Sequence, residues 1–340
     1  MNYDVTIGIP VFNAEKYLRQ TLESALAQTF AGIEFLLVDD ECSDGSLQIV
    51  RELQQTHPRG ADIHLLHQPH NMGVGAARNR LIDEAQGRFL YFMDADDRIE
   101  PGTIALLMEH QQRTGADIVF GSYERIGEAV LDTRQYPFLE MEGEGALAAY
   151  AWRRYGAMQT TIWNYVVRID VLRQNRLRFI DASFWEDMAF TFELLPCCRH
   201  AVLLPDITYH YQCHDDSLSN YQEREHIGKD EVQRNISTVD YMKRQCAKTS
   251  GKPFQPERCR QVLTTAFYVL CYILKHEKKI APSFTVSELK PLMSHPATLS
   301  DILHFSHARF LHLALWLGSR LPAPVVVALV RAVGKVKGLT

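Results

Sequence analysis

The 340 residues of the chain exceed one typical domain and favour two domains, or one domain with a large appendage. Hydrophobic residues (46%) and charged residues (23%) occur in the proportions of ordinary soluble globular proteins. The net charge of −5 argues against a general nucleic-acid-binding protein. This charge is uneven, because residues 302–340 contain five basic and no acidic side chains, which leaves −10 on residues 1–301.

The seven cysteines are odd in number and show no CxxC spacing, so they indicate neither a zinc site nor a disulfide framework. A reducing, cytoplasmic environment fits this pattern best. The first residues, MNYDVTIGIP, lack a basic segment followed by an apolar one, so they predict a strand and not a signal peptide.

Strands and helices are expected to alternate along the first hundred residues. Short apolar runs predict strands at 5–9, 35–38, 63–66 and 89–93. Apolar residues at helical spacing follow the first strand, and Asn13 is expected to cap that helix. Further helices are expected from about residue 46 and from the glycines at 73–75. This alternation is typical of a doubly wound parallel sheet.

The stretch FLYFMDADD at 89–97 joins a predicted buried strand to three carboxylates, Asp94, Asp96 and Asp97. Open α/β sheets bind their ligands at the carboxyl ends of the strands. Two carboxylates one residue apart can hold a hard divalent cation, which typically bridges protein oxygens to phosphate oxygens. The alternative is a solvated acidic turn without a ligand.

Other strand ends also carry candidate chemistry. Phe12 can offer an aromatic face to a base, and Asp39 and Asp40 can accept hydrogen bonds from a base or a ribose, with helix capping as the alternative. Arg78 can contact phosphate, unless it lies on a solvated helix face. GVGAAR at 73–78 also resembles a damaged GxGxxG, but it lacks the third glycine and does not follow the first strand, which disfavours a dinucleotide-dependent oxidoreductase.

Four motifs in this order resemble the family 2 glycosyltransferases of the bacterial polysaccharide type, which have the GT-A fold. The motifs are IPVFN at 9–13, LLVDDECSDGS at 36–46, NMGVGAARN at 71–79 and FLYFMDADD at 89–97. The resemblance implies a GT-A domain, an α/β doubly wound and mostly parallel sheet, over residues 1–216. Residues 217–340 are expected to form a helical C-terminal appendage.

The resemblance also implies a donor-binding surface. Pro10, Phe12 and Asn13 match the first nucleotide-contacting loop of the family, where Phe12 keeps the ring of the usual tyrosine and loses its hydroxyl. Asp40 matches the acid that typically reads the base, with Asp39 beside it.

The last motif matches the DxD sequence of the family. Asp94, Ala95 and Asp96 correspond to this motif, with Asp94 towards the ribose and Asp96 on the metal, and Asp97 as a substitute. Arg78 matches the residue near the diphosphate. A divalent cation, Mg or Mn, is therefore expected to offset the charge of the leaving nucleoside diphosphate.

A second acidic pair lies in FWEDMAF at 184–190. Inverting sugar transfer needs a carboxylate that takes the proton of the acceptor hydroxyl. By resemblance we expect Asp187 to be this base, with Glu186 as the fallback. The alternative is an acid that only favours the helix dipole.

Later motifs leave alternatives open. Residues 161–179 are expected to be rich in helix, and Trp163 and Asn164 there face either the donor sugar or the core. His210 and His214 are either ligands of a metal or phosphate, or polar residues flanking a strand.

The C-terminal region is expected to be helical at 223–248 and 257–279, followed by a basic tail at 302–340. The tail contains no run of about 20 apolar residues, so a membrane-spanning helix is not predicted. Two short amphipathic helices with a basic edge would suit an anionic membrane surface, and packing against the body or a dimer partner is the alternative.

These patterns together predict a metal-dependent inverting glycosyltransferase. The expected donor is a nucleotide sugar, UDP-linked by preference, and the expected acceptor is a hydroxyl of a glycan or lipid-linked glycan. Such an enzyme would be cytoplasmic, free or peripheral at the inner face of the cell membrane, and would not bind nucleic acid. The alternatives are a non-catalytic scaffold with the same fold and a sugar-phosphate nucleotidyltransferase, which needs a glycine-rich basic loop where this chain has PVFNAEK.

Overall fold

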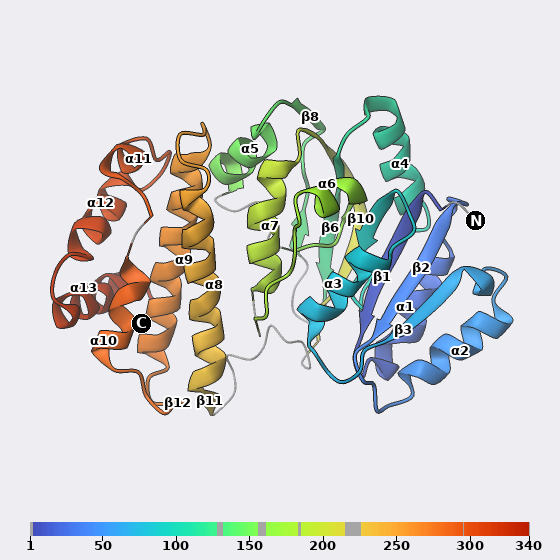
Figure 1. Ribbon diagram of the computed structural model, residues 1–340, viewed down its shortest axis with the longest axis horizontal. Helices are drawn as coiled ribbons and strands as arrows, with labels where there is room; N and C mark the ends of the chain where they lie inside the picture. Colours follow the sequence, from blue (N-terminus) through green and yellow to red (C-terminus); the bar gives the residue numbers. More distant parts are fainter. Residues whose placement is uncertain are drawn as a thin grey trace. The chain divides into compact units, whose positions relative to one another are not determined.

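The computed structural model describes residues 3–127, 132–155, 161–182, 185–214, 226–294 and 296–339. The chain divides into two compact units (Figure 1). The first unit comprises Met1–Leu147, Thr161–Asp181 and Leu194–Leu218, and the second comprises Ala148–Thr160, Ala182–Glu193 and Ser219–Thr340. The boundary predicted between residues 216 and 217 falls outside the described residues and stays a prediction.

The first unit is built on a ten-stranded mixed sheet. Its strands are β1 (Val5–Val11), β2 (Ile33–Asp39), β3 (Ile63–His67), β4 (Phe89–Phe92), β5 (Arg98–Ile99), β6 (Ile118–Ile126), β7 (Asp132–Arg134), β8 (Leu139–Glu142), β9 (Tyr165–Arg168) and β10 (His200–Gln212). The strand order is β3-β2-β1-β4-β9-β6-β10-β5, with β7 beside β6 and β8 beside β10.

Helices connect these strands. They are α1 (Glu15–Leu26), α2 (Ser46–Thr56), η1 (Gly60–Asp62), α3 (Val74–Glu84), α4 (Thr103–Thr114) and α6 (Ile169–Gln174). Two more helices, α5 (Ala146–Tyr155) and α7 (Glu186–Cys197), are divided between the two units.

The first four strands of the sheet order, β3, β2, β1 and β4, are all parallel. Consecutive residues of a strand point to opposite faces, and all residues from Val5 to Ile9 are buried, so both faces of β1 are covered. This arrangement confirms the doubly wound α/β prediction. Antiparallel pairs then add β9 to β4 and β6, and β5 and β8 to β10, which makes the complete sheet mixed.

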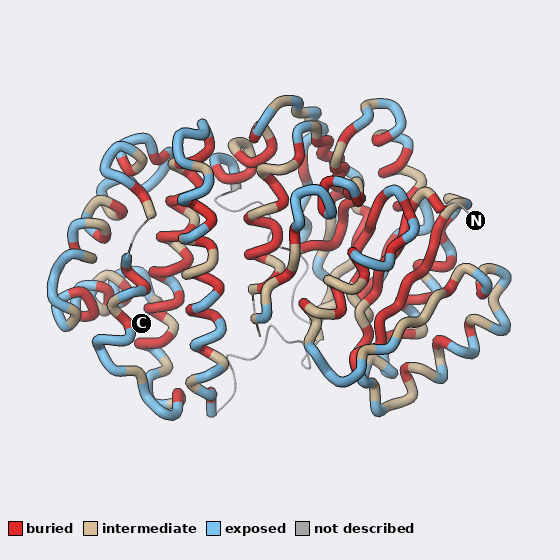
Figure 2. The backbone as a smooth tube through the Cα atoms, in the orientation of Figure 1, coloured by how far each residue is buried: buried red, intermediate tan, exposed pale blue. Residues whose placement is uncertain are grey.

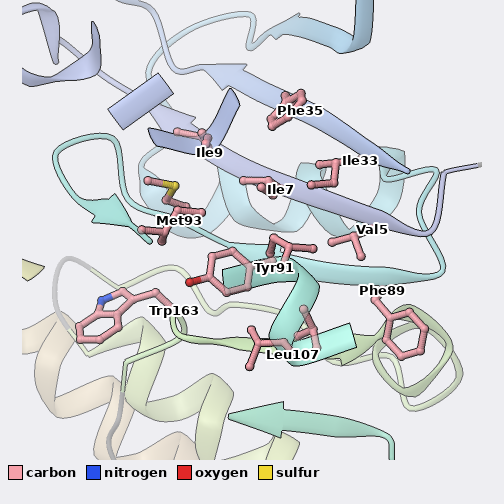
Figure 3. Close-up of a cluster of buried hydrophobic side chains, with 14 of the residues drawn as sticks. Val5, Ile7, Ile9, Ile33, Phe35, Phe89, Tyr91, Met93, Leu107 and Trp163 are labelled. Carbon is pink, nitrogen blue, oxygen red and sulfur yellow. The ribbon is translucent and has the colours of Figure 1, made fainter. Parts of the chain in front are cut away.

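Alternate residues of the central strands form the core of this unit (Figure 3). Val5, Ile7 and Ile9 of β1 are fully buried and belong to the same cluster as Tyr91 and Met93. Met93 is the last apolar residue before the acidic motif. The packed strand therefore delivers the carboxylates to its carboxyl end in a fixed position.

Residues 161–179 are not the helix-rich segment that the sequence suggested. Only the six residues of α6 are helical, and they follow the strand β9. The β-branched pair Val166 and Val167 is fully buried, and β9 pairs with both β4 and β6. Sheet pairing on both sides therefore outweighs the local helical tendency.

The second unit is mainly helical, as expected. Its elements are β11 (Ile227–Gly228), α8 (Lys229–Ala247), α9 (Gln255–Lys275), β12 (Ile280–Ala281), α10 (Val286–Leu289), η3 (Lys290–Met293), α11 (Leu299–Leu303), α12 (Arg309–Gly318) and α13 (Ala323–Val336). Helices α8 and α9 confirm the two predicted helices, and α9 is buried over most of its length (Figure 2). Within the described ranges, no helix combines the length and apolar character needed to cross a membrane.

His312 anchors α12 in this unit. Its side chain is buried, and its ring meets that of Phe305 edge-on with centroids 5.3 Å apart. Burial, together with the positive charge of Arg260, lowers the pKa of His312 to about 4. The helix is therefore held by a histidine that is neutral at physiological pH.

We predict that the free energy of unfolding falls by about 2 kcal/mol between about pH 7 and about pH 5 because of His312. As the pH falls, the unfolded chain takes up a proton near the ordinary pKa of 6.5, whereas the folded chain does so only near 4. His312→Leu should remove most of this decline in urea unfolding. His304→Gln, at an exposed position, is the control, and an unchanged pH dependence in His312→Leu would contradict the assignment.

Candidate active site

Two carboxylates at the end of β4 are each joined to a different cationic or titratable partner. Asp94 Oδ1 accepts a hydrogen bond from Arg78 Nη2 at 2.8 Å. Asp96 Oδ2 lies 2.7 Å from His214 Nε2. About a quarter to a third of each carboxylate side chain remains exposed, 26% for Asp94 and 31% for Asp96. Both predicted DxD acids are thus held in place and accessible.

Asp97, the third acid of the motif, points into the protein. It is fully buried, its Oδ2 accepts the hydroxyl of Tyr209 at 2.6 Å, and its Oδ1 accepts the N–H of Gln212 at 2.7 Å. Burial, then the charges of Asp96 and Asp94, raise its pKa well above the ordinary value. Asp97 therefore anchors β10 to the acidic motif, and this geometry disfavours it as a substitute metal ligand.

Arg78 does not lie on a solvated helix face. It is only 6% exposed, and its guanidinium lies 5.5 Å from the centre of the Phe179 ring while bound to Asp94. An arginine in this position holds one carboxylate of the motif and places positive charge at the edge of the site.

Helix α1 supports the acidic motif, which the sequence did not reveal. The ring of Tyr17 stacks on His214 with centroids 4.4 Å apart, and the hydroxyl of Thr21 donates to the carbonyl of Ala95 at 2.9 Å. Tyr17 and Thr21 are four residues apart and so share one face of the helix. In the sequence, only this spacing of four could have indicated that the two side chains act together.

The electrostatics of this site suit a cation. Burial, then the charge of Asp94, raise the pKa of Asp96 above its ordinary value, while His214 opposes the shift. A divalent cation would stabilise the ionised form of Asp96 against both effects. Asp96 and Asp94 are the candidate ligands, and His214 Nε2 contacts Asp96.

Among the described residues, no group of three or more His, Cys, Asp or Glu side chains is already arranged to hold a metal ion. A cation here would therefore take its remaining ligands from water and from phosphate oxygens. Mg²⁺ is commonly bound in this way, with one or two carboxylates and substrate phosphates. The residues fit the predicted cofactor.

Asp39 and Asp40 both stabilise neighbouring loops. Although burial raises the pKa of Asp39, hydrogen bonds from the N–H of Cys42 and from His67 hold it below the ordinary value. Asp40 is buried, and its two oxygens accept the N–H groups of Met72 and Gly73 at 2.8 and 2.9 Å. Asp40 thus joins the loops that follow β2 and β3.

The loop after β1 exposes an aromatic ring at this edge of the sheet. Pro10 is the second-last residue of β1, and Phe12 just beyond it is 52% exposed. The carbonyl of Val11 accepts the N–H of Asp40 at 2.9 Å, so Phe12 lies next in sequence to a residue bonded to Asp40. Phe12 and Asp40 thus follow the ends of two adjacent strands, β1 and β2, and their role in binding a base stays a prediction.

The prediction that Asn13 caps α1 is wrong. Ala14 occupies the cap position without a side-chain hydrogen bond, and Asn13 Oδ1 instead accepts the N–H of Ser43 at 2.8 Å. The first turn of α1 is capped from the neighbouring loop, because Ser46 Oγ accepts the N–H of Ala14 and Asp44 Oδ2 accepts that of Glu15. Asn13 therefore joins the first two loops of the site.

Three further residues take structural positions. Trp163 is only 4% exposed and stacks on Tyr209, and Asn164 is buried and donates to the carbonyl of Gly121. His210 uses both ring nitrogens for glutamates, Glu100 at 2.6 Å and Glu124 at 2.7 Å. These contacts favour the core and structural alternatives, and leave His214 as the histidine at the acidic motif.

The second acidic pair lies in the other unit. Glu186 and Asp187 form the first turn of α7, and Glu186 is buried while Asp187 is partly exposed. Acids in a first turn favour the helix dipole, which agrees with the structural alternative without excluding a catalytic one. The catalytic role of this pair stays a prediction.

A sheet that is parallel in its first half, with a carboxylate pair at the carboxyl end of β4 and an arginine of α3 bound to it, is the arrangement expected of the GT-A fold. The solved structure of S. aureus TarS 1-349 in complex with UDP-GlcNAc has this fold. It matches with a TM-score of 0.74 and 15% identity, over 98% of this chain and 92% of that one. The mannosyltransferase PcManGT from Pyrobaculum calidifontis, in complex with GDP-Man and Mn²⁺, matches with a TM-score of 0.55 and 16% identity, over 99% and 88%.

The sequence comparisons identify the family. The model of glycosyl transferase family 2 matches residues 6–179, which include the four motifs. The uncharacterized glycosyltransferase YibD of Escherichia coli (strain K12) is 26% identical over 304 residues, covering 86% of this chain and 87% of YibD. The chain belongs to glycosyl transferase family 2, and it is a glycosyltransferase.

We predict that two adjacent carboxylates contribute very differently to the free energy of unfolding. Asp97→Ala should lower the free energy of unfolding by about 3 kcal/mol, because the buried hydroxyl of Tyr209 and N–H of Gln212 lose their acceptor. Asp96→Ala should change it by less than about 1 kcal/mol, since this side chain is partly exposed and repelled by Asp94. Urea unfolding measures both free energies. Equal losses would contradict the assignment of Asp97 as a structural residue and Asp96 as an accessible one.

Proposed function

We propose that this enzyme moves a sugar from a nucleoside diphosphate donor to a hydroxyl group, with inversion at the anomeric carbon and with a divalent cation. The observation that carries the proposal is the pair Asp94 and Asp96, held by Arg78 and His214 at the carboxyl end of a central strand. Sheet edges of this kind bind phosphorylated ligands. Membership of the family supports the same reaction class.

The loops after β1 and β2 would bind the nucleotide. The exposed ring of Phe12 can stack on the base, and Asp40, whose oxygens accept the 72–73 N–H groups, can accept one further hydrogen bond from it. Pro10, Asn13 and Asp39 would hold these loops in shape. TarS in complex with UDP-GlcNAc supports a UDP-sugar, and PcManGT in complex with GDP-Man makes GDP the second choice.

Asp96 and Asp94 would hold Mg or Mn. The backbone between them is fixed because the hydroxyl of Thr21 donates to the carbonyl of Ala95. A bound cation would neutralise charge on the leaving diphosphate. Arg78 adds a fixed positive charge beside it, and His214 orients Asp96. The PcManGT complex, which contains Mn²⁺, supports this choice of cofactor.

Asp187 would act as the general base, with Glu186 as the fallback. The carboxylate takes the proton from the acceptor hydroxyl while the acceptor oxygen bonds to the anomeric carbon. The bond from this carbon to the diphosphate oxygen breaks, and the nucleoside diphosphate leaves. Partial exposure of Asp187 supports its access to solvent and ligand.

The acceptor is a hydroxyl of a glycan or of a lipid-linked glycan, and we place the enzyme in the cytoplasm, at the inner face of the cell membrane. Seven free thiols support a reducing compartment. The net charge of −5 argues against nucleic acid as a partner.

Calorimetric titration tests the donor site. UDP should bind the protein with Mn²⁺ present, and Asp96→Asn or removal of the metal should weaken binding at least about tenfold, because the metal loses a ligand. Asp206→Asn, at an exposed position of β10, is the matched control and should bind as the native chain does. If UDP, GDP and dTDP all fail to bind, the non-catalytic alternative replaces this proposal.

Single-turnover kinetics test the base. Asp187→Asn should lower the rate of sugar transfer about 10²- to 10⁴-fold and leave the affinity for UDP unchanged, because only proton transfer is lost. Glu186→Gln should have a smaller effect. The reverse order would assign the base to Glu186, and equal weak effects would remove both residues from the mechanism.

A further inference from the structure

Helices α12 and α13 carry apolar side chains that the second unit leaves uncovered. On α12, Phe310 and Leu317 are exposed at positions seven residues apart, and Leu321 continues the line beyond the helix. On α13, Val325, Leu329 and Val336 repeat the pattern. Phe310 and Val336 are each 90% exposed. These six residues are called the outer face below.

The outer face is not required for packing within the unit. Each helix buries a different stripe, which includes Leu315 on α12 and Val326 and Val330 on α13. A helix that is apolar on both sides needs a second apolar environment. Figure 2 shows the alternation of buried and exposed positions along this part of the chain.

The two halves of the outer face adjoin each other. Helices α12 and α13 are in contact, and a Cβ built on Gly318 would lie 3.6 Å from Leu329 Cδ1. A groove of about 420 Å³ along α13 is lined by apolar residues that include Val286 and Ala328, and also by Arg331 and Lys335. The exposed side chains therefore form one surface and not isolated positions.

Basic groups border this surface. Arg309, Arg320, Lys335 and Lys337 are exposed, and no acidic residue occurs in residues 302–340. Arg331 pairs with Glu277 of α9 at 2.8 Å and so contributes less. The guanidinium of Arg320 lies 3.4 Å from the centre of the Trp316 ring, an aromatic and cationic pair suited to a lipid headgroup region.

We propose that the outer face docks on an anionic membrane surface, with its apolar side chains inserted and the four basic groups among the headgroups. A second copy of this chain would bring like charges together across a symmetric interface, which disfavours a dimer here. Apolar insertion plus positive charge is the combination that binds interfacial helices to anionic lipid. The use of this surface in the reaction rests on the proposed function, because a lipid-linked acceptor would lie at a membrane.

Co-sedimentation with vesicles tests the surface. The full chain should bind phosphatidylcholine vesicles that contain phosphatidylglycerol at least about tenfold more tightly than pure phosphatidylcholine vesicles. Phe310→Ser/Leu317→Ser/Leu329→Ser should abolish binding to the anionic vesicles, because the inserted apolar side chains are lost. Lys335→Gln/Lys337→Gln should weaken binding to the anionic vesicles about 25-fold, which is about fivefold for each basic residue.

The matched controls are exposed residues that do not belong to the outer face. Phe138→Ser removes an exposed ring, and Lys248→Gln/Lys278→Gln removes two exposed charges, so both should bind vesicles as the native chain does. Unfolding curves confirm that all variants fold, and UDP affinity, measured in parallel, should stay unchanged. Absence of vesicle binding, or equal binding by the triple variant, overturns the surface whatever the UDP result. A dimer of the native chain that the triple variant loses also overturns it, whereas a loss of UDP binding alone counts against the proposed function.

Discussion

The mutual repulsion of three carboxylates within residues 94–97 is the constraint on which the active site depends. Each acid needs a separate partner, and the fold supplies Arg78 from α3, His214 just beyond β10 and Tyr209 from β10. Burial and neighbouring charge still raise the pKa of Asp96. The negative charge gathered at this point of the sheet favours a cation, and a cation held here could in turn bind phosphate oxygens.

A network of hydrogen bonds turns the strand ends into a preorganised platform. Asn13 and Ser46 join the first two loops, Asp40 joins the second to the third, and Thr21 ties α1 to the acidic motif. These contacts fix backbone positions while leaving Phe12 exposed. A rigid frame with one exposed aromatic ring reduces the ordering cost of binding a flexible nucleotide.

The family model ends at residue 179, and the structure adds functional detail in the remainder of the chain. His214 lies in that remainder and completes the acidic motif. The helical unit combines a deeply buried helix, α9, with the outer face of α12 and α13, which is apolar and bordered by positive charge. The proposed donor site thus rests on the sheet, and the proposed membrane docking on the last two helices.

The sequence by itself determined the first four strands, the order of the motifs and the reaction class, because these depend on local apolar runs and on residue types at strand ends. It could not separate Asp97 from Asp94 and Asp96, which look alike in the chain. The roles of Asp96 and Asp97 depend on partners more than a hundred residues away, such as His214, 118 positions after Asp96. Only tertiary structure brings such groups together, and burial then decides which carboxylate becomes structural and which stays accessible.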